Sequence, residues 1–195
     1  HTLRAMQAVR PDKILRLAML FHDFGKPDCA SADENGTDHF HGHGAVSSKM
    51  AEEILKRLRY DNDTIDRVRE LVYWHDMEIL PEKRAVRRAA SKVGKELFPL
   101  LLEVKQADLA AQSDYQRPQK EEWLRSLHDI YEQIQEEGDC LSLKDLAVTG
   151  RDLIAAGMKP GPQLGQTLQN LLQLVLEDPS RNSKEYLLSN LPKET

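Results

Sequence analysis

Histidine and aspartate residues that could bind a metal gather in the first part of this 195-residue chain. Imidazole and carboxylate ligands together suit Mn, Fe, Co, Ni or Zn, and Mg is kept as a further option although it prefers oxygen ligands alone. The adjacent pair His22-Asp23 follows a strongly apolar stretch, where burial without a partner would be costly. The residue types therefore predict a site for one or two divalent ions. Six of the seven histidines lie within the first 75 residues: His1, His22, His39, His41, His43 and His75.

Two more ligand candidates interrupt apolar stripes of predicted helices. His75 takes the place after Val72 in one stripe, and Asp108 takes the place after Val104 in another. A single histidine at such a position is more often a core histidine whose hydrogen bonds are satisfied. A single aspartate is more often an internal cap or one partner of an ion pair. Taken together with His22-Asp23 they favour metal binding, with Asp23 able to bridge two ions. A purely structural interpretation, buried polar pairs without metal, stays open.

These side chains must be positioned by helices, because helical spacing runs through nearly the whole chain and no useful strand-like alternation occurs. A Gly- and Pro-rich turn at residues 157–162 separates two short helices near the end. The predicted fold is all-α: a helical bundle over residues 1–138 and a smaller helical tail over residues 139–195. Pro11 is expected in the first turn of its helix. The main helices are expected at residues 11–25, 46–58, 62–75, 97–108 and 123–138, with a loop at 28–43.

The charge is unevenly spread. Lys and Arg number 27 and Asp and Glu 32, so the net charge is −5, and the deficit lies mainly in residues 121–139. This balance argues against strong non-specific binding of nucleic acid by the whole chain. One basic cluster, with Arg84, Arg87 and Arg88, could neutralise phosphates and is predicted to bind RNA. A solvated helix face is the alternative interpretation.

Several classes of protein are excluded or disfavoured. No run of 18 apolar residues exists, so no transmembrane helix is expected, and no secretory signal opens the chain. Cys29 and Cys140 are too few for a disulfide framework, which favours a reducing, cytoplasmic setting. Because the sequence starts at His1 and not at Met, we expect a fragment or a trimmed sequence.

The segment from Leu17 to Pro27, which contains His22-Asp23, resembles the HD-domain metal-dependent phosphohydrolases. This resemblance implies an HD-domain helical bundle. It also implies a first ion held by His1, His22, Asp23 and Asp108, and a second held by His43 and His75. The expected enzyme activity is metal-assisted hydrolysis of phosphoesters of nucleotides or RNA ends, of the 2′,3′-cyclic phosphodiesterase or phosphatase type.

Three residues are assigned to the expected hydrolysis: Asp23, Lys26 and His41. Lys26 could neutralise a phosphate oxygen, or serve only as a cation at a helix C-terminus. His41, or equally His39, could protonate the leaving oxygen or support the metal ligands.

A closer resemblance is to the bacterial tRNA nucleotidyltransferases, the CCA-adding enzymes. It is carried by residues 39–43 (HFHGH), 73–76 (YWHD), 146–154 (LAVTGRDLI) and 157–165 (GMKPGPQLG) and by Asn182. The Gly-Ser dipeptide and paired aspartates of that family's catalytic head are missing, so this chain alone should not add nucleotides. The leading hypothesis is a phosphohydrolase, as a fragment of such an enzyme or as a stand-alone protein. The alternative is a non-catalytic body that binds tRNA.

Overall fold

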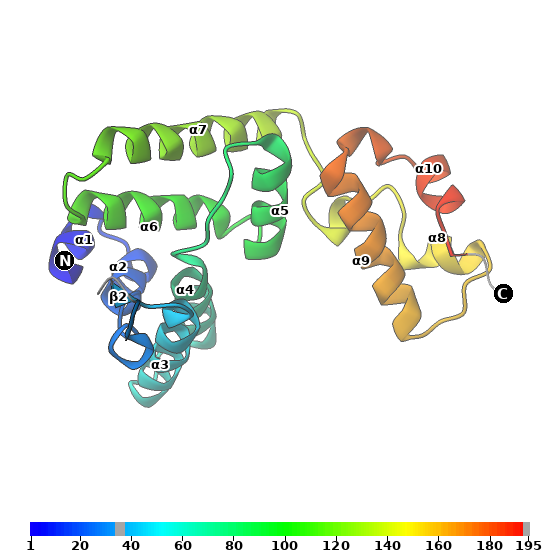
Figure 1. The fold of residues 1–195 in the computed structure, drawn as a ribbon. Coiled ribbons are helices and arrows are strands. Elements are labelled where there is room, and N and C mark those ends of the chain that lie inside the picture. Colours follow the sequence, from blue (N-terminus) through cyan, green and yellow to red (C-terminus); the bar gives the residue numbers. More distant parts are fainter. Residues whose placement is uncertain (34–37, 193–195) are drawn as a thin grey trace. The chain divides into compact units, whose positions relative to one another are not determined.

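α-Helices dominate the computed structural model, which describes residues 1–33 and 38–192 (Figure 1). The prediction of an all-α fold is confirmed. Two-residue strands β1 (Ser31–Ala32) and β2 (Asp38–His39) pair antiparallel, Ser31 opposite His39. The described residues form α1 (Thr2–Ala8), α2 (Lys13–Phe21), α3 (His43–Arg57), α4 (Asn62–Trp74), α5 (Lys83–Val93), α6 (Phe98–Ala111), α7 (Arg117–Glu136), α8 (Gly150–Ala155), α9 (Pro162–Glu177) and α10 (Lys184–Ser189), with 3₁₀ turns η1 (Pro27–Cys29), η2 (Leu143–Asp145) and η3 (Pro179–Arg181).

The chain folds into two compact units that alternate along the sequence. The first unit consists of His1–Glu78 and Glu96–His128, and the second of Ile79–Lys95 and the residues from Asp129 onward. Helix α5 therefore belongs with the C-terminal helices, and α7 contributes its two ends to different units. The predicted domains, residues 1–138 and 139–195, follow one another along the chain, whereas these two units are interleaved. That division into domains stays a prediction.

Helix α2 forms the centre of the first unit, where it packs against α1, α3, α4 and α6. The carboxylate of Asp12 caps it by accepting hydrogen bonds from the amides of Ile14 (2.8 Å) and Leu15 (3.1 Å). Pro11 therefore precedes the N-cap residue of α2. The prediction that Pro11 lies in the first turn of this helix is wrong. Leu15 and Met19 are fully buried, which fixes the helix and the polar residues at its end.

The second unit is built around α9, which packs against α5 and α8. Leu171 and Val175 of α9 and Val86 of α5 are buried, giving this unit its own apolar core. The side chain of Asn182 joins two loops of the unit: it accepts from the amide of Ala147 at 2.8 Å and donates to the carbonyl of Asp145 at 3.0 Å.

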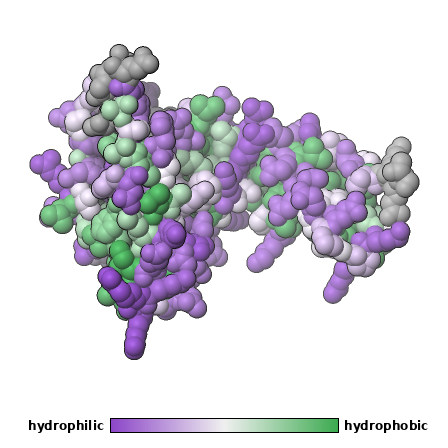
Figure 2. Space-filling view, turned by 60° about the horizontal axis from the view of Figure 1, so that its bottom comes forward, coloured by the Kyte–Doolittle hydropathy of each residue, from purple (hydrophilic) through white to green (hydrophobic). Residues whose placement is uncertain are grey.

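Several large apolar side chains are exposed on the surface. Figure 2 shows a largely hydrophilic face on which hydrophobic residues form small patches. Large exposed side chains such as Leu3, Leu80 and Tyr115 come from distant parts of the sequence. Within residues 1–33 and 38–192, no helix combines the length and apolar content that a membrane span requires.

The two cysteines should differ in reactivity. Cys140 is 3% exposed, and burial raises the pKa of its thiol to about 11, whereas Cys29 is only partly buried. Since the thiolate is the reactive form, we expect iodoacetamide at pH 8 to modify Cys29 much faster than Cys140 in the native protein. Peptide mass spectrometry measures the two rates, and equal rates would contradict the buried position of Cys140. The denatured chain, in which both thiols should react alike, is the control.

Candidate metal centre

A close contact between α2 and α3 places the first site residues. His22 ends α2 and is fully buried, and the backbone turns directly after it. The amide of Gly25 donates to the hydroxyl of Ser47 at 2.8 Å. A Cβ at Gly25 would lie 2.8 Å from the carbonyl oxygen of His43 and the amide nitrogen of Ser47. Only glycine allows this approach, which brings Asp23 toward α3.

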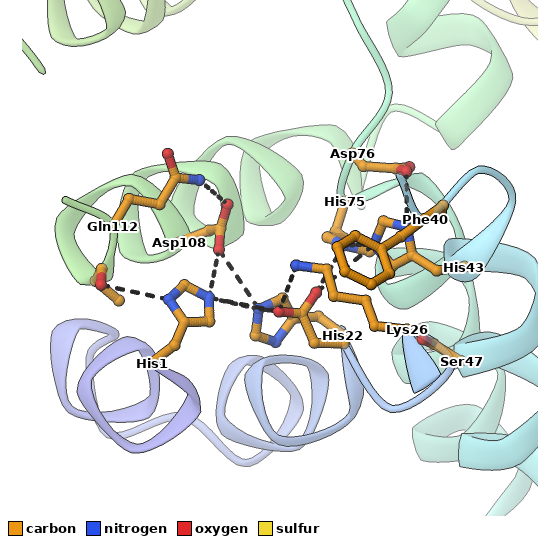
Figure 3. Close-up of polar contacts among 12 residues, drawn as sticks. His1, His22, Lys26, Phe40, His43, Ser47, His75, Asp76, Asp108 and Gln112 are labelled. Atoms are coloured by element: carbon orange, nitrogen blue, oxygen red, sulfur yellow. Dashed lines mark hydrogen bonds and ion pairs between the residues drawn. The ribbon is translucent and has the colours of Figure 1, made fainter. Parts of the chain in front are cut away.

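The first cluster joins the N-terminus of α1, the end of α2 and α6. The Nε2 atom of His1 lies 2.9 Å from Oδ1 of Asp108 and 3.6 Å from Oδ2 of Asp23. The Nε2 atom of His22 lies 3.4 Å from each of the same two oxygens. Figure 3 shows Asp108 reaching toward both imidazoles from α6. The four residues thus surround one point.

The second cluster uses the other oxygen of Asp23. Oδ1 of Asp23 lies 3.6 Å from Nε2 of His43 and 3.8 Å from Nε2 of His75. His43 begins α3 and His75 ends α4, and both are buried. The carboxylate of Asp23 therefore stands between two groups of imidazoles, one at each oxygen.

The four histidines of the two clusters all direct Nδ1 at a backbone carbonyl. The Nδ1 atoms of His22, His43 and His75 each lie 2.7–2.9 Å from the carbonyl oxygen three residues earlier, and Nδ1 of His1 lies 3.3 Å from the carbonyl of Ala111. A carbonyl only accepts, so each Nδ1 carries a hydrogen and each neutral ring presents a lone pair at Nε2.

These lone pairs meet in two pairs. The Nε2 atoms of His1 and His22 are 3.1 Å apart, and those of His43 and His75 are 3.0 Å apart. Two lone pairs at that distance repel unless a proton or a metal ion lies between them. Donor atoms bound to one ion at about 2.0–2.2 Å would themselves lie roughly 3–3.6 Å apart, so the observed spacing fits a metal.

The electrostatics of the two clusters differ. Burial disfavours charge on His22, but the protonated ring would donate from Nε2 to Asp108 and is attracted by the charge of Asp23, and these contacts raise its pKa. Burial opposes ionisation of Asp108, but its hydrogen bond with His22 outweighs this and lowers its pKa. Burial lowers the pKa of His75 to about 4. At neutral pH the His75 ring is therefore uncharged, and a metal ion binds to the lone pair of an uncharged imidazole.

Three neighbours of the clusters were not predicted from the sequence. Gln112 donates to Oδ2 of Asp108 at 2.7 Å, and Asp76 lies 3.5 Å from Nδ1 of His43. The buried ammonium of Lys105 donates to the carbonyls of His75 at 2.8 Å and Met77 at 2.7 Å. Burial lowers the pKa of Lys105 to about 8. A sequence signal existed, because Lys105 and Gln112 share with Asp108 one face of a helix at spacings of three and four.

The structure brings together all six predicted ligands, beside a cleft of about 450 Å³. Their role as ligands stays a prediction, and so do the catalytic roles of Asp23, Lys26 and His41. The ammonium of Lys26 pairs with Oδ2 of Asp23 at 2.8 Å. His41 stacks on His39, whose ring pairs with Asp33, and no contact within the described part of the chain joins His41 to either cluster.

The predicted RNA-binding arginines of α5 all pair with acidic residues of their own unit. Arg84 and Arg88 are about half exposed and both contact Glu177. Arg87 is 7% exposed and pairs with the equally buried Asp139 at 3.1 Å. Arg87 also donates to the carbonyls of Leu176 and Glu177 at the end of α9. These contacts make Arg87 a structural tie between α5 and α9, and RNA binding by the three residues stays a prediction.

Comparison with known proteins identifies the family. The family model for tRNA nucleotidyltransferase domain 2 matches residues 43–191. The chain is 34% identical over 164 residues to the CC-adding tRNA nucleotidyltransferase of Thermus thermophilus, which covers 83% of this chain and 36% of that protein. It is 28% identical over 182 residues to the A-adding tRNA nucleotidyltransferase of Deinococcus radiodurans, covering 89% of this chain and 40% of that protein. No solved structure matches.

The chain therefore belongs to the tRNA nucleotidyltransferase domain 2 family, as the second resemblance suggested. It spans 36% and 40% of the lengths of these two curated relatives. The prediction that it is an HD-type phosphohydrolase enzyme is wrong, because the family and both relatives are named for nucleotide transfer to tRNA and not for hydrolysis. The family model begins at His43, so His1, His22 and Asp23 lie outside the matched residues.

Arg87 should matter for stability far more than its exposed neighbour. Arg87→Met leaves the buried carboxylate of Asp139 without its partner, and we expect it to lower the free energy of unfolding by about 3–5 kcal/mol. The same change at Arg84, which is 57% exposed, should cost less than about 1 kcal/mol. Urea denaturation followed by circular dichroism measures both values. Equal effects would show that the buried pair contributes nothing beyond a surface ion pair.

Proposed function

We propose that this chain is the tRNA-binding body, with its helical tail, of a tRNA nucleotidyltransferase. The observation that carries the proposal is the family match over residues 43–191, which includes residues of both compact units. The two relatives are named for adding nucleotides to tRNA, and this chain corresponds to a part of each. In this proposal it supplies contacts to the tRNA, and nucleotide addition belongs to the whole enzyme.

The charge distribution supports a phosphate-binding role. Helix α5 has the sequence KRAVRRAASKV, with five cations and no acidic residue, in a protein whose net charge is −5. Arg84 and Arg88 keep half of their surface exposed although they contact Glu177. Arginine and lysine side chains that reach phosphates release counterions, which makes binding salt-dependent.

Binding of tRNA is the direct test. Fluorescence anisotropy with end-labelled tRNA should show saturable binding at about 50 mM salt, weakening as the salt concentration rises because phosphate contacts dominate the affinity. Unlabelled tRNA should compete at a lower nucleotide concentration than duplex DNA, since a tRNA-binding body recognises RNA shape. No binding by the folded protein, or equal competition by duplex DNA, would overturn the proposal.

We also propose that the body holds one or two divalent transition-metal ions, with Mn, Fe, Co, Ni and Zn as the candidates. His1, His22, Asp23 and Asp108 would hold the first ion, and Asp23 with His43 and His75 the second. The facing Nε2 atoms, 3.1 Å and 3.0 Å apart, support this proposal. A bound ion would supply positive charge to offset two carboxylates, and the residues around it would join α1, α2, α3, α4 and α6.

Metal binding should raise thermal stability. After treatment with a chelator, adding a matching ion at about 100 times its dissociation constant should stabilise the fold by about 2.7 kcal/mol, seen as a higher Tm. Mg should have a smaller effect, because histidine nitrogens are poor ligands for it. His22→Ala should abolish the response, and His128→Ala, which changes a histidine outside both clusters, should keep it. A response that survives His22→Ala would contradict the assigned ligands.

A further inference from the structure

A groove of about 660 Å³ lies within the second unit, between α5, the η2 turn and α9. Its volume is within the range of about 300–1,000 Å³ that is typical of ligand-binding clefts. Three buried leucines contribute to its lining: Leu141, Leu172 and Leu176. Leu143, on the rim, remains 37% exposed. The groove thus combines an apolar floor with an apolar side chain open to solvent.

The walls of the groove carry two pairs of polar residues at helical spacing. Arg88 and Lys92, four residues apart on α5, line it from one helix. Gln169 and Gln173, four residues apart on α9, line it from another. Its lining among the described residues includes no acidic side chain, although the protein as a whole is acidic. Arg88 is held at its place by its contact with Glu177 just beyond the groove.

This combination matches the chemistry of a ribonucleotide. Cations bind phosphate, side-chain amides both donate to and accept from base edges and 2′-hydroxyls, and an apolar floor accepts the face of a base or ribose. An acidic peptide would also pair with the cations and the amides, but the match of this chain to tRNA nucleotidyltransferases favours RNA over a peptide. A second copy of this chain would offer the acidic residues of segment 121–139, but no base or ribose for the amides and the apolar floor.

We infer that the groove between α5 and α9 binds a nucleotide segment of RNA, with Arg88 and Lys92 at the phosphates and Gln169 and Gln173 at the base or ribose. The inference rests on the proposed tRNA-binding function and names the place where that function is carried out. Phosphate contacts set the register of the RNA on α5, and the amides of α9 distinguish the nucleotide.

The test compares three variants of the whole chain in tRNA binding measured at several salt concentrations. Lys92→Gln removes one cation from the groove and should weaken binding about threefold to tenfold while lowering the slope of log K against log[salt] by about 1. Leu143→Ser removes an apolar contact and should weaken binding while leaving the slope unchanged. Lys159→Gln, which removes an exposed cation of the same unit outside the groove, is the matched control and should leave affinity near the wild-type value.

The outcomes separate this inference from the function it rests on. If the wild-type chain binds tRNA and both groove variants behave like Lys159→Gln, the groove is not the RNA site and only the inference fails. If the folded wild-type chain binds no tRNA, the proposed function itself fails. Leu143 and Lys92 are exposed, so circular dichroism should show unchanged folding of their variants and keep the comparison valid.

Discussion

The hydrogen bond from a histidine Nδ1 to a backbone carbonyl is the interaction on which the arrangement of the candidate metal centre depends. It occurs in the same form at His22, His43 and His75, each with the carbonyl three residues earlier. Each bond fixes the orientation of the ring and the nitrogen that carries the hydrogen. The opposite nitrogens are thereby directed inward, and the convergence of three helix ends around Asp23 follows from this repeated local arrangement.

The packing of the helices holds the three helix ends close to Asp23. Gly25 lets the end of α2 approach α3 more closely than any other residue would permit. Lys105 connects the end of α4 with α6, the helix that also carries Asp108. A buried lysine is tolerated here because two carbonyls at a helix end accept from its ammonium. The positions of the two clusters are therefore set in part by Gly25 and Lys105, which belong to neither cluster.

Much of this arrangement could be predicted from the sequence, and the reasons for the exceptions are physical. His75 and Asp108 stood out because a polar residue on an apolar stripe needs a partner. The ends of helices were predicted less accurately: α3 starts at His43, before the apolar pattern begins at Val46, because His43 in its first turn contacts His75, which the apolar pattern does not show. Arg87 looked like its neighbours in the sequence, and only tertiary packing reveals that it is buried against Asp139.

The error about enzyme activity has a different origin. A set of histidines and aspartates defines what a site can bind, but the same set can serve proteins with different functions. Four segments carried the resemblance that the family match bears out, and two of them, residues 146–154 and 157–165, contain none of the metal-ligand candidates. The helical tail, which has no evident chemistry of its own, thus helped to identify the family.

The interleaving of the two units has a consequence for dissecting the protein. Helix α5 lies early in the sequence, yet its buried residues Val86 and Ala90 belong to the unit completed by α9. A chain truncated after residue 138 would retain α5 but lose the helix that covers it, and so expose an apolar stripe beside five cations. No single cut of the polypeptide yields both units intact. Recombination at one point could therefore not exchange one unit without dividing the other.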